Sequence, residues 1–111
     1  EGSREHVRSF TYVGDVVDGC MLAMNAMDVC RGEIFNIGSD TTHTTGEGID
    51  LIEELTGKKA RFVQVPPRPG DQVVTKADIT KARRVLGYNP TMSLREGLAR
   101  EVAWVRESIG L

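Results

Sequence analysis

Two arginines and one aspartate are the residues best suited to chemistry in this sequence. Arg68 and Asp71 stand in the stretch VPPRPGDQVVTKAD, residues 65–78, where three prolines and a glycine crowd around them. Proline fixes backbone angles and glycine reaches angles that other residues avoid, so this stretch predicts a shaped loop rather than a helix or a central strand. Arg8 is the second arginine, and it opens the β-prone stretch RSFTYV.

These side chains suit the binding of phosphate groups and sugars. A guanidinium at a fixed position can hold phosphate oxygens in bidentate contact, and a stiff loop loses little entropy when a ligand binds. The carboxylate of Asp71 follows Gly70 and can accept hydrogen bonds from the hydroxyls of a sugar. The residues alone leave a second interpretation open, in which Arg68 and Asp71 pair with each other and only tie the loop.

The other reactive side chains form no catalytic or metal-binding pattern. His6 and His43 stand in polar surroundings, and Cys20 and Cys30 are too far apart for a C-x-x-C motif. We interpret both cysteines as free thiols, with a disulfide or a metal site as the alternatives. The sequence contains no G-x-S-x-G, H-E-x-x-H, Walker or G-x-G-x-x-G motif, so it predicts neither a catalytic residue nor a metal ligand.

The composition is typical of a soluble globular protein. Of the 111 residues, 40% are hydrophobic and 27% are charged, with a net charge of -2. This charge gives no support for nucleic-acid binding, and no apolar run approaches the roughly 18 residues of a membrane span. The polar start EGSREHVRS does not resemble a signal peptide, so we expect a cytoplasmic protein in which residues 1–111 form a single unit.

The pattern of apolar residues predicts an α/β fold, a small mixed sheet of three to four short strands with about four helices. Strands are expected at residues 8–13, 33–37 and 60–65, with a short edge strand at 72–75. So few strands are too few for a complete doubly wound sheet, which hints at a fragment of a longer protein.

Helix starts and stops are marked more clearly than the strands. The expected helices run from an N-cap at Asp15 to residue 27 or 28, from a Thr44–Glu47 capping box to Gly57, from Asp78 to Gly87, and onward from a Ser93–Glu96 capping box. The last helix carries an apolar stripe flanked by Trp104.

Three stretches follow one another along residues 7–105: VRSFTYVGDVVDGCMLAM, then GEIFNIGSDTTHT, then ELTGKKARFVQVPPRPGDQVVTKADITKARRVLGYNPTMSLREGLAREVAW. As an ordered set they resemble the C-terminal, substrate-binding part of the NAD-dependent epimerase/dehydratase family, extended short-chain dehydrogenases that act on nucleotide sugars. The resemblance implies the C-terminal lobe of an extended Rossmann-type enzyme. Each stretch is a weak signal by itself, and the specificity lies in their order and spacing.

The resemblance assigns a role to each of the three residues. It implies that Arg8 and Arg68 contact the diphosphate of a UDP- or dTDP-sugar and that Asp71 binds its ribose. The family's glycine-rich NAD motif and its catalytic Y-x-x-x-K are absent from this chain, because neither Tyr12 nor Tyr88 has a lysine four positions on. We therefore expect NAD to bind a preceding domain of a parent enzyme and this chain alone to bind no cofactor and to be inactive.

Several alternatives remain at this stage. Within the family, 4-epimerisation as in UDP-glucose 4-epimerases is the leading activity, and dehydration or decarboxylation stay open. Outside it, the chain would be a free-standing nucleotide-binding module or an interaction domain that uses its last helix. A lobe separated from a Rossmann domain exposes apolar surface, with Phe10, Tyr12 and Phe35 as candidates, so we expect dimers or higher association.

Overall fold

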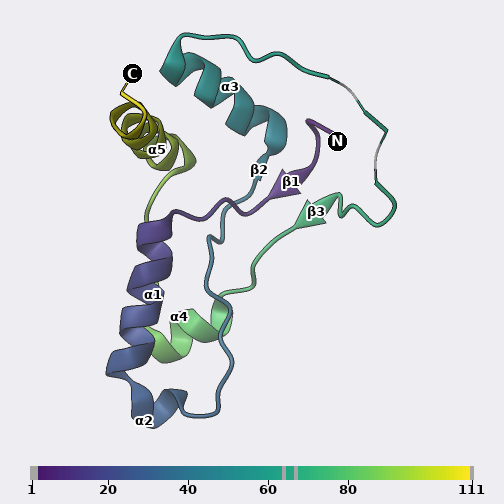
Figure 1. The fold of residues 1–111 in the computed structure, drawn as a ribbon. Helices are drawn as coiled ribbons and strands as arrows, with labels where there is room; N and C mark the ends of the chain where they lie inside the picture. The colour runs from purple at the N-terminus through teal and green to yellow at the C-terminus, as the bar shows by residue number, and fades with distance from the viewer. Residues whose placement is uncertain (1–2, 64, 67, 111) are drawn as a thin grey trace. The chain divides into compact units, whose positions relative to one another are not determined.

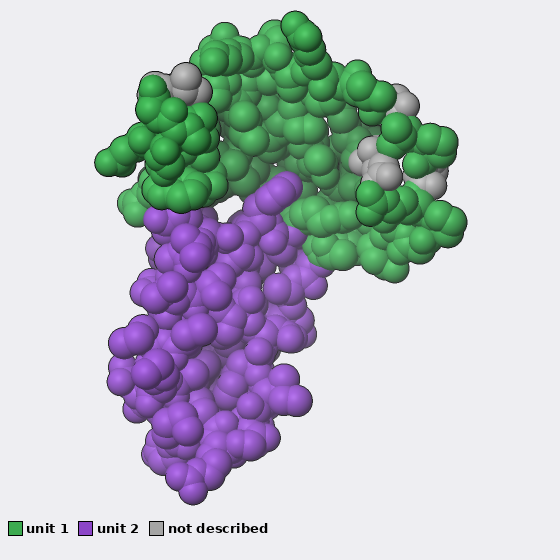
Figure 2. All heavy atoms as spheres, in the orientation of Figure 1, with its two compact units in different colours: residues 1–8, 43–75, 93–111 green, residues 9–42, 76–92 purple. Residues whose placement is uncertain are grey.

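The computed structural model describes residues 3–63, 65–66 and 68–110, and it has an α/β fold (Figure 1). In chain order the elements are β1 (Val7–Arg8), α1 (Val13–Asn25), α2 (Met27–Cys30), β2 (His43–Thr44), α3 (Thr45–Thr56), β3 (Val74–Thr75), α4 (Thr80–Leu86) and α5 (Leu94–Ser108). The chain divides into two compact units, coloured separately in Figure 2. Unit 1 comprises residues 1–8, 43–75 and 93–111, and unit 2 comprises residues 9–42 and 76–92.

Unit 1 contains a mixed three-stranded sheet with the order β2-β1-β3. The central strand β1 runs antiparallel to β2, where Arg8 stands opposite His43, and parallel to β3, where Arg8 is in register with Thr75. The N–H of Val7 donates to the carbonyl of Val73 at 2.8 Å. The sheet confirms the predicted mixture of parallel and antiparallel pairing.

Two capped helices complete unit 1 and confirm the local signals in the sequence. The Thr44 and Ser93 side chains accept hydrogen bonds from the backbone N–H groups of Glu47 and Glu96, which closes the capping boxes of α3 and α5. Gly57 ends α3 in the left-handed conformation, with φ of 69°. The two helices pack together, and an apolar groove of about 300 Å³ remains open between them, lined by Ile52, Leu98, Val102 and Val105 among others.

Unit 2 is built around a small core at α4. The buried residues are Ile79, Ala82, Leu86 and Tyr88, and apolar side chains of α1 and of residues 35–37 pack against them. The carboxylate of Asp78 accepts the N–H of Thr80 at the start of α4, and Gly87 ends this helix with φ of 68°. The N-cap of α4 is Ile79 rather than the predicted Asp78, whereas the predicted stop at Gly87 is observed.

Three strand predictions were wrong in whole or in part. Residues 33–37 form no strand, because the Glu33 N–H donates to Cys30 and no backbone ladder partner exists for this segment among the described residues. Residues 60–63 and 65 form none either, and position 64 lies outside the described residues. The strand expected at 8–13 is reduced to Val7–Arg8, because α1 already begins at Val13.

Asp15 is not the N-cap that the sequence suggested. Tyr12 holds that position, and Asp15 lies inside the first turn of α1 with only 8% of its surface exposed. Its carboxylate accepts the backbone N–H groups of Thr91 and Met92, at 3.4 and 3.3 Å. Asp15 therefore holds a distant segment of unit 2 rather than its own helix. With α2 following α1, the described residues contain five helices rather than four.

Candidate functional site

Arg8 lies in the central strand of the unit 1 sheet and is half-buried. The Nη1 of Arg8 donates to two backbone carbonyls, that of the preceding residue Val7 at 2.8 Å and that of Val73 at 3.4 Å. These contacts fix the guanidinium over the junction of β1 with β3. Its Nε and Nη2 have no partner among the described residues, so the group keeps donors for an anion.

Arg68 and Asp71 lie together in an exposed turn, as the proline and glycine pattern predicted. The N–H of Asp71 donates to the carbonyl of Arg68 at 3.2 Å, and Gly70 between them adopts φ of 89°. Only glycine adopts such an angle without steric cost, so Gly70 is required for this turn. Position 67, one of the prolines, lies outside the described residues.

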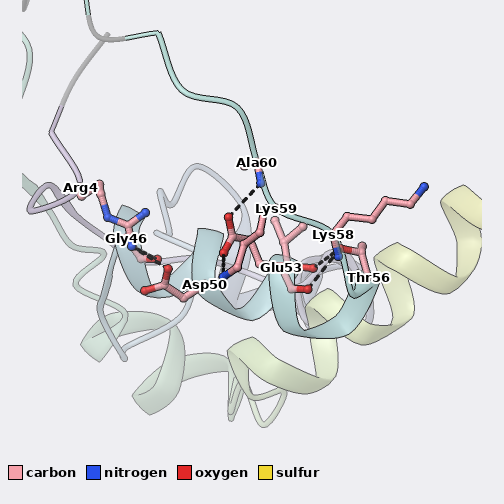
Figure 3. Close-up of polar contacts among 9 residues, drawn as sticks. Arg4, Gly46, Asp50, Glu53, Thr56, Lys58, Lys59 and Ala60 are labelled. Carbon is pink, nitrogen blue, oxygen red and sulfur yellow. Dashed lines mark hydrogen bonds and ion pairs between the residues drawn. The ribbon is translucent and has the colours of Figure 1, made fainter.

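The segment that carries this turn begins next to α3, and its first residues are bound to that helix (Figure 3). The carboxylate of Glu53 accepts the Ala60 N–H at 2.9 Å and the Lys59 ammonium at 2.5 Å. The hydrogen bond from Lys59 is the largest cause that lowers the pKa of Glu53 below its usual value. About one turn earlier on α3, Arg4 pairs with Asp50 at 2.7 Å and stands 5.8 Å from the ring centre of Phe62.

The end of the same segment leads directly into the sheet. Asp71 precedes Val73 by two residues, and Val73 O accepts both the Val7 N–H and the Arg8 guanidinium. The structure therefore joins the turn of residues 68–71 to the strand next to Arg8, within unit 1. Two guanidinium groups and a carboxylate on connected segments can bind a ligand that combines phosphate groups with hydroxyls.

The strand β2 at this site was not predicted from the sequence. β2 is only two residues long, and it places His43 directly opposite Arg8. The one available signal was the capping box that begins at Thr44, because an extended residue must precede a capped helix. Asn36 lies outside this site, in unit 2, where its side-chain amide donates to the carbonyl of Asp78 at 3.2 Å.

The other reactive side chains in the described part of the chain form no second site. Cys20 and Cys30 are free thiols, in agreement with the preferred interpretation of the sequence. Among the described residues no group of three or more His, Cys, Asp or Glu side chains is placed to hold a metal ion. No helix in the described part of the chain is long and apolar enough to cross a membrane.

The exposed apolar residues differ from those expected. Phe10 is exposed at 39%, but Phe35 is partly buried against the unit 2 core with Lys81 over its ring, and Tyr12 is also partly buried. Exposed apolar residues also recur at helical spacing along α1: Val13, Val17, Met21 and Met24.

The fold and the site thus define an α/β protein with a polar, arginine-containing candidate site beside a short mixed sheet. The sequence model of the family described as GDP-mannose 4,6 dehydratase matches residues 1–101. The UDP-glucuronate 4-epimerase of Thermodesulfobacterium geofontis is 34% identical over 111 residues, which cover 99% of this chain and 33% of that protein. The chain belongs to the NAD-dependent epimerase/dehydratase family.

Solved structures agree with this assignment. The UDP-glucuronic acid 4-epimerase of Bacillus cereus, in complex with UDP-glucuronic acid and NAD, is similar at 33% identity and a TM-score of 0.87, over 96% of this chain and 34% of that one. The UDP-glucose 4-epimerase of Thermotoga maritima, with UDP-glucose, is similar at 38% identity and a TM-score of 0.83. The match covers 97% of this chain and 34% of that one. The chain spans about a third of the length of these relatives.

The described residues do not fit NAD, the cofactor that the family implies. The dinucleotide-binding motif needs a glycine-rich turn between a strand and a helix, where the pyrophosphate approaches the backbone. At α3, which follows β2, Gly46 and Gly48 are buried, and a Cβ on Gly46 would stand 3.2 Å from the carbonyl of Arg4. Gly46 therefore serves the close packing of the chain against itself, and this turn is not the glycine-rich turn that a dinucleotide needs.

Proposed function

We propose that this chain forms the nucleotide-binding part of an NAD-dependent nucleotide-sugar epimerase of the UDP-glucose 4-epimerase kind. In this proposal Arg8 and Arg68 contact the diphosphate of a UDP- or dTDP-sugar, and Asp71 contacts its ribose. The observation that carries the proposal is the strand register: Arg8, with unused donors, lies beside the strand into which the turn of Arg68 and Asp71 leads.

The chemistry of the whole enzyme belongs to the proposal as well. Epimerisation needs NAD and an acid or base at the sugar, and we assign both to the part of the relatives' length that this chain does not span. The 111-residue chain alone is then inactive: UDP-glucose incubated with it and NAD stays UDP-glucose. Formation of UDP-galactose by the purified chain would contradict this. Dehydration and decarboxylation are the alternatives for the whole enzyme, and product analysis of a full-length protein decides among the three.

Titration with UDP tests the binding function directly. Because only part of the nucleotide-sugar site is present, we expect a Kd of about 1 mM, or roughly −4 kcal/mol. Two-dimensional NMR of the labelled chain follows the titration and shows which backbone amides respond. The responding amides should belong to β1, β3 and the turn of residues 68–71.

Three arginine variants make the test specific. Arg8→Gln and Arg68→Gln each remove a charged donor, and each should weaken UDP binding by about fivefold or more, or roughly 1 kcal/mol. Arg84→Gln is the matched control, because Arg84 is an exposed arginine of α4 in unit 2. If all three variants bind UDP as well as the original chain does, the proposed site is wrong. If no nucleotide binds at all, an interaction domain becomes the better hypothesis.

The predicted self-association also remains part of the proposal. It now rests on the stripe of Val13, Val17, Met21 and Met24 on α1, whose side chains are between 49% and 67% exposed. Sedimentation velocity at rising concentration should show dimers or larger species, and Met24→Gln should reduce them. A chain that stays monomeric at high concentration refutes the association.

The cytoplasmic location is retained on the ground that both cysteines are free thiols.

A further inference from the structure

His43 occupies a special place in the sheet of unit 1, directly opposite Arg8 in the antiparallel pair of β1 and β2. Residues opposite each other in such a pair point to the same face of the sheet, with Cβ atoms about 5 Å apart. Thr75 of β3 is in register with Arg8 on the other side. His43, Arg8 and Thr75 therefore form a row of hydrogen-bonding side chains across one face of the three strands.

The charged groups around His43 are few. From α3, the Glu47 carboxylate lies 3.6 Å from His43 Nδ1, and the same carboxylate accepts the Thr44 N–H at 2.6 Å as part of the capping box. From β1, the neighbour is Arg8. Arg4 also approaches α3, but its guanidinium pairs with Asp50. About a third of the His43 side chain, 36%, is exposed, so a ligand in solution can reach it.

We propose that His43, in its protonated form, is a second cation beside Arg8 in the diphosphate site. The inference rests on the proposed function, because the ligand is the diphosphate of a nucleotide sugar. Two adjacent cations repel each other, and an anion bound between them removes that repulsion. Protonation of His43 and binding of the diphosphate therefore favour each other, and this coupling must be reciprocal. A histidine side chain changes its charge in mildly acidic solution, so the affinity should depend on pH.

UDP-glucose is the probe for this test, because both of its phosphates are diesters that keep their charge in this pH range. We expect the chain to bind UDP-glucose about threefold more tightly at about pH 5.5 than at about pH 8.0 in low salt. This factor corresponds to one added positive charge about 7 Å from a phosphate in water-like surroundings. Added salt should reduce the difference.

Variants assign the effect to one residue. His43→Gln should bind equally at both pH values, at the weaker level, whereas His43→Arg should bind tightly at both. The rescue by arginine separates a charge effect from damage to the strand. His6→Gln changes the only other histidine of the chain and should keep the pH dependence. If His6→Gln abolishes it, or if His43→Gln retains it, the assignment to His43 is wrong.

Arg8→Gln distinguishes failure of this inference from failure of the proposed function. If Arg8→Gln weakens binding of UDP-glucose while His43→Gln leaves the pH dependence intact, the site stands and only the role of His43 falls. If Arg8→Gln has no effect, or if the original chain binds no UDP-glucose at either pH, the proposed function fails and the role of His43 fails with it.

Discussion

Removal of one hydroxyl from the core of unit 2 gives a direct test of the fold. Tyr88 is 1% exposed, and its hydroxyl donates to the carbonyl of Gly38 at 3.0 Å. Tyr88→Phe keeps the ring in its place and removes only this donor. The carbonyl of Gly38, a buried residue, then loses that partner.

The expected cost follows from the two parts of this change. A buried hydrogen bond between neutral groups contributes about 1 kcal/mol, and a buried acceptor left without a partner adds a penalty of similar size. We therefore expect the free energy of unfolding to fall by about 1–2 kcal/mol. With a urea dependence of about 1.5 kcal/mol per molar, the unfolding midpoint falls by about 1 M.

Urea unfolding followed by circular dichroism at the helical band measures this change. Thr42→Val is the control, because it removes a hydroxyl from an exposed side chain of the same unit and should change the stability by less than about 0.5 kcal/mol. A Tyr88→Phe midpoint equal to that of the control would mean that the Gly38 carbonyl is hydrated, and the account of this core would be wrong.

Tyr88 should also make the protein less stable at alkaline pH. Burial, more than the nearby Asp15 charge, raises the pKa of Tyr88 above its usual value. Below the pKa of the unfolded chain the hydroxyl is protonated in both states, so it adds no pH dependence there. As the pH rises above that value, the unfolded chain releases the proton first, and the free energy of unfolding decreases. Tyr88→Phe should remove this part of the alkaline decrease.

Three further changes test the helix ends and one ion pair, each by chemical denaturation. Ser93→Ala should lower the free energy of unfolding by about 1 kcal/mol, because Ser93 Oγ accepts the Glu96 N–H at 3.2 Å; an unchanged value would refute the capping box. Gly57→Ala should also cost about 1 kcal/mol, because φ is 69° there; a stabilising effect would contradict that geometry. The hydrogen bond from Arg95 lowers the pKa of Glu54. The contribution of this ion pair to the free energy of unfolding is therefore present above the usual carboxylate pKa, and it is lost as the pH falls through the lowered value. Glu54→Gln should flatten that acid decrease, and an unchanged acid profile would count against the pair.

The helices could be predicted from the sequence because their signals are local. The Thr44–Glu47 and Ser93–Glu96 boxes lie within one turn of the helices that they begin, and each side chain contacts the backbone three residues away. Gly57 and Gly87 act in the same local way at the helix ends. Such signals need no knowledge of the rest of the fold.

The sequence misled where a residue acts over a long range. Asp15 is a residue type that favours N-caps and lies near the start of a helix. Its carboxylate instead accepts the backbone N–H groups of Thr91 and Met92, more than 70 positions away. Residues 33–37 have the composition of a strand, but β-propensity describes a fit to a pleated surface and does not supply the partner strand. Neither outcome is visible in a window of neighbouring residues.

The candidate site combines both situations. The turn of Arg68 and Asp71 was predictable, because prolines and a glycine impose it locally. The strand register that sets this segment beside Arg8 was not, because β1, β2 and β3 have two residues each and join positions 7–8 to 43–44 and 74–75. Two-residue strands have no alternation that a pattern search can detect. The row of His43, Arg8 and Thr75 depends entirely on that register, since a slip by one residue would turn His43 to the opposite face. The loss of pH dependence in His43→Gln and its replacement by constant binding in His43→Arg would therefore test the register as well as the charge.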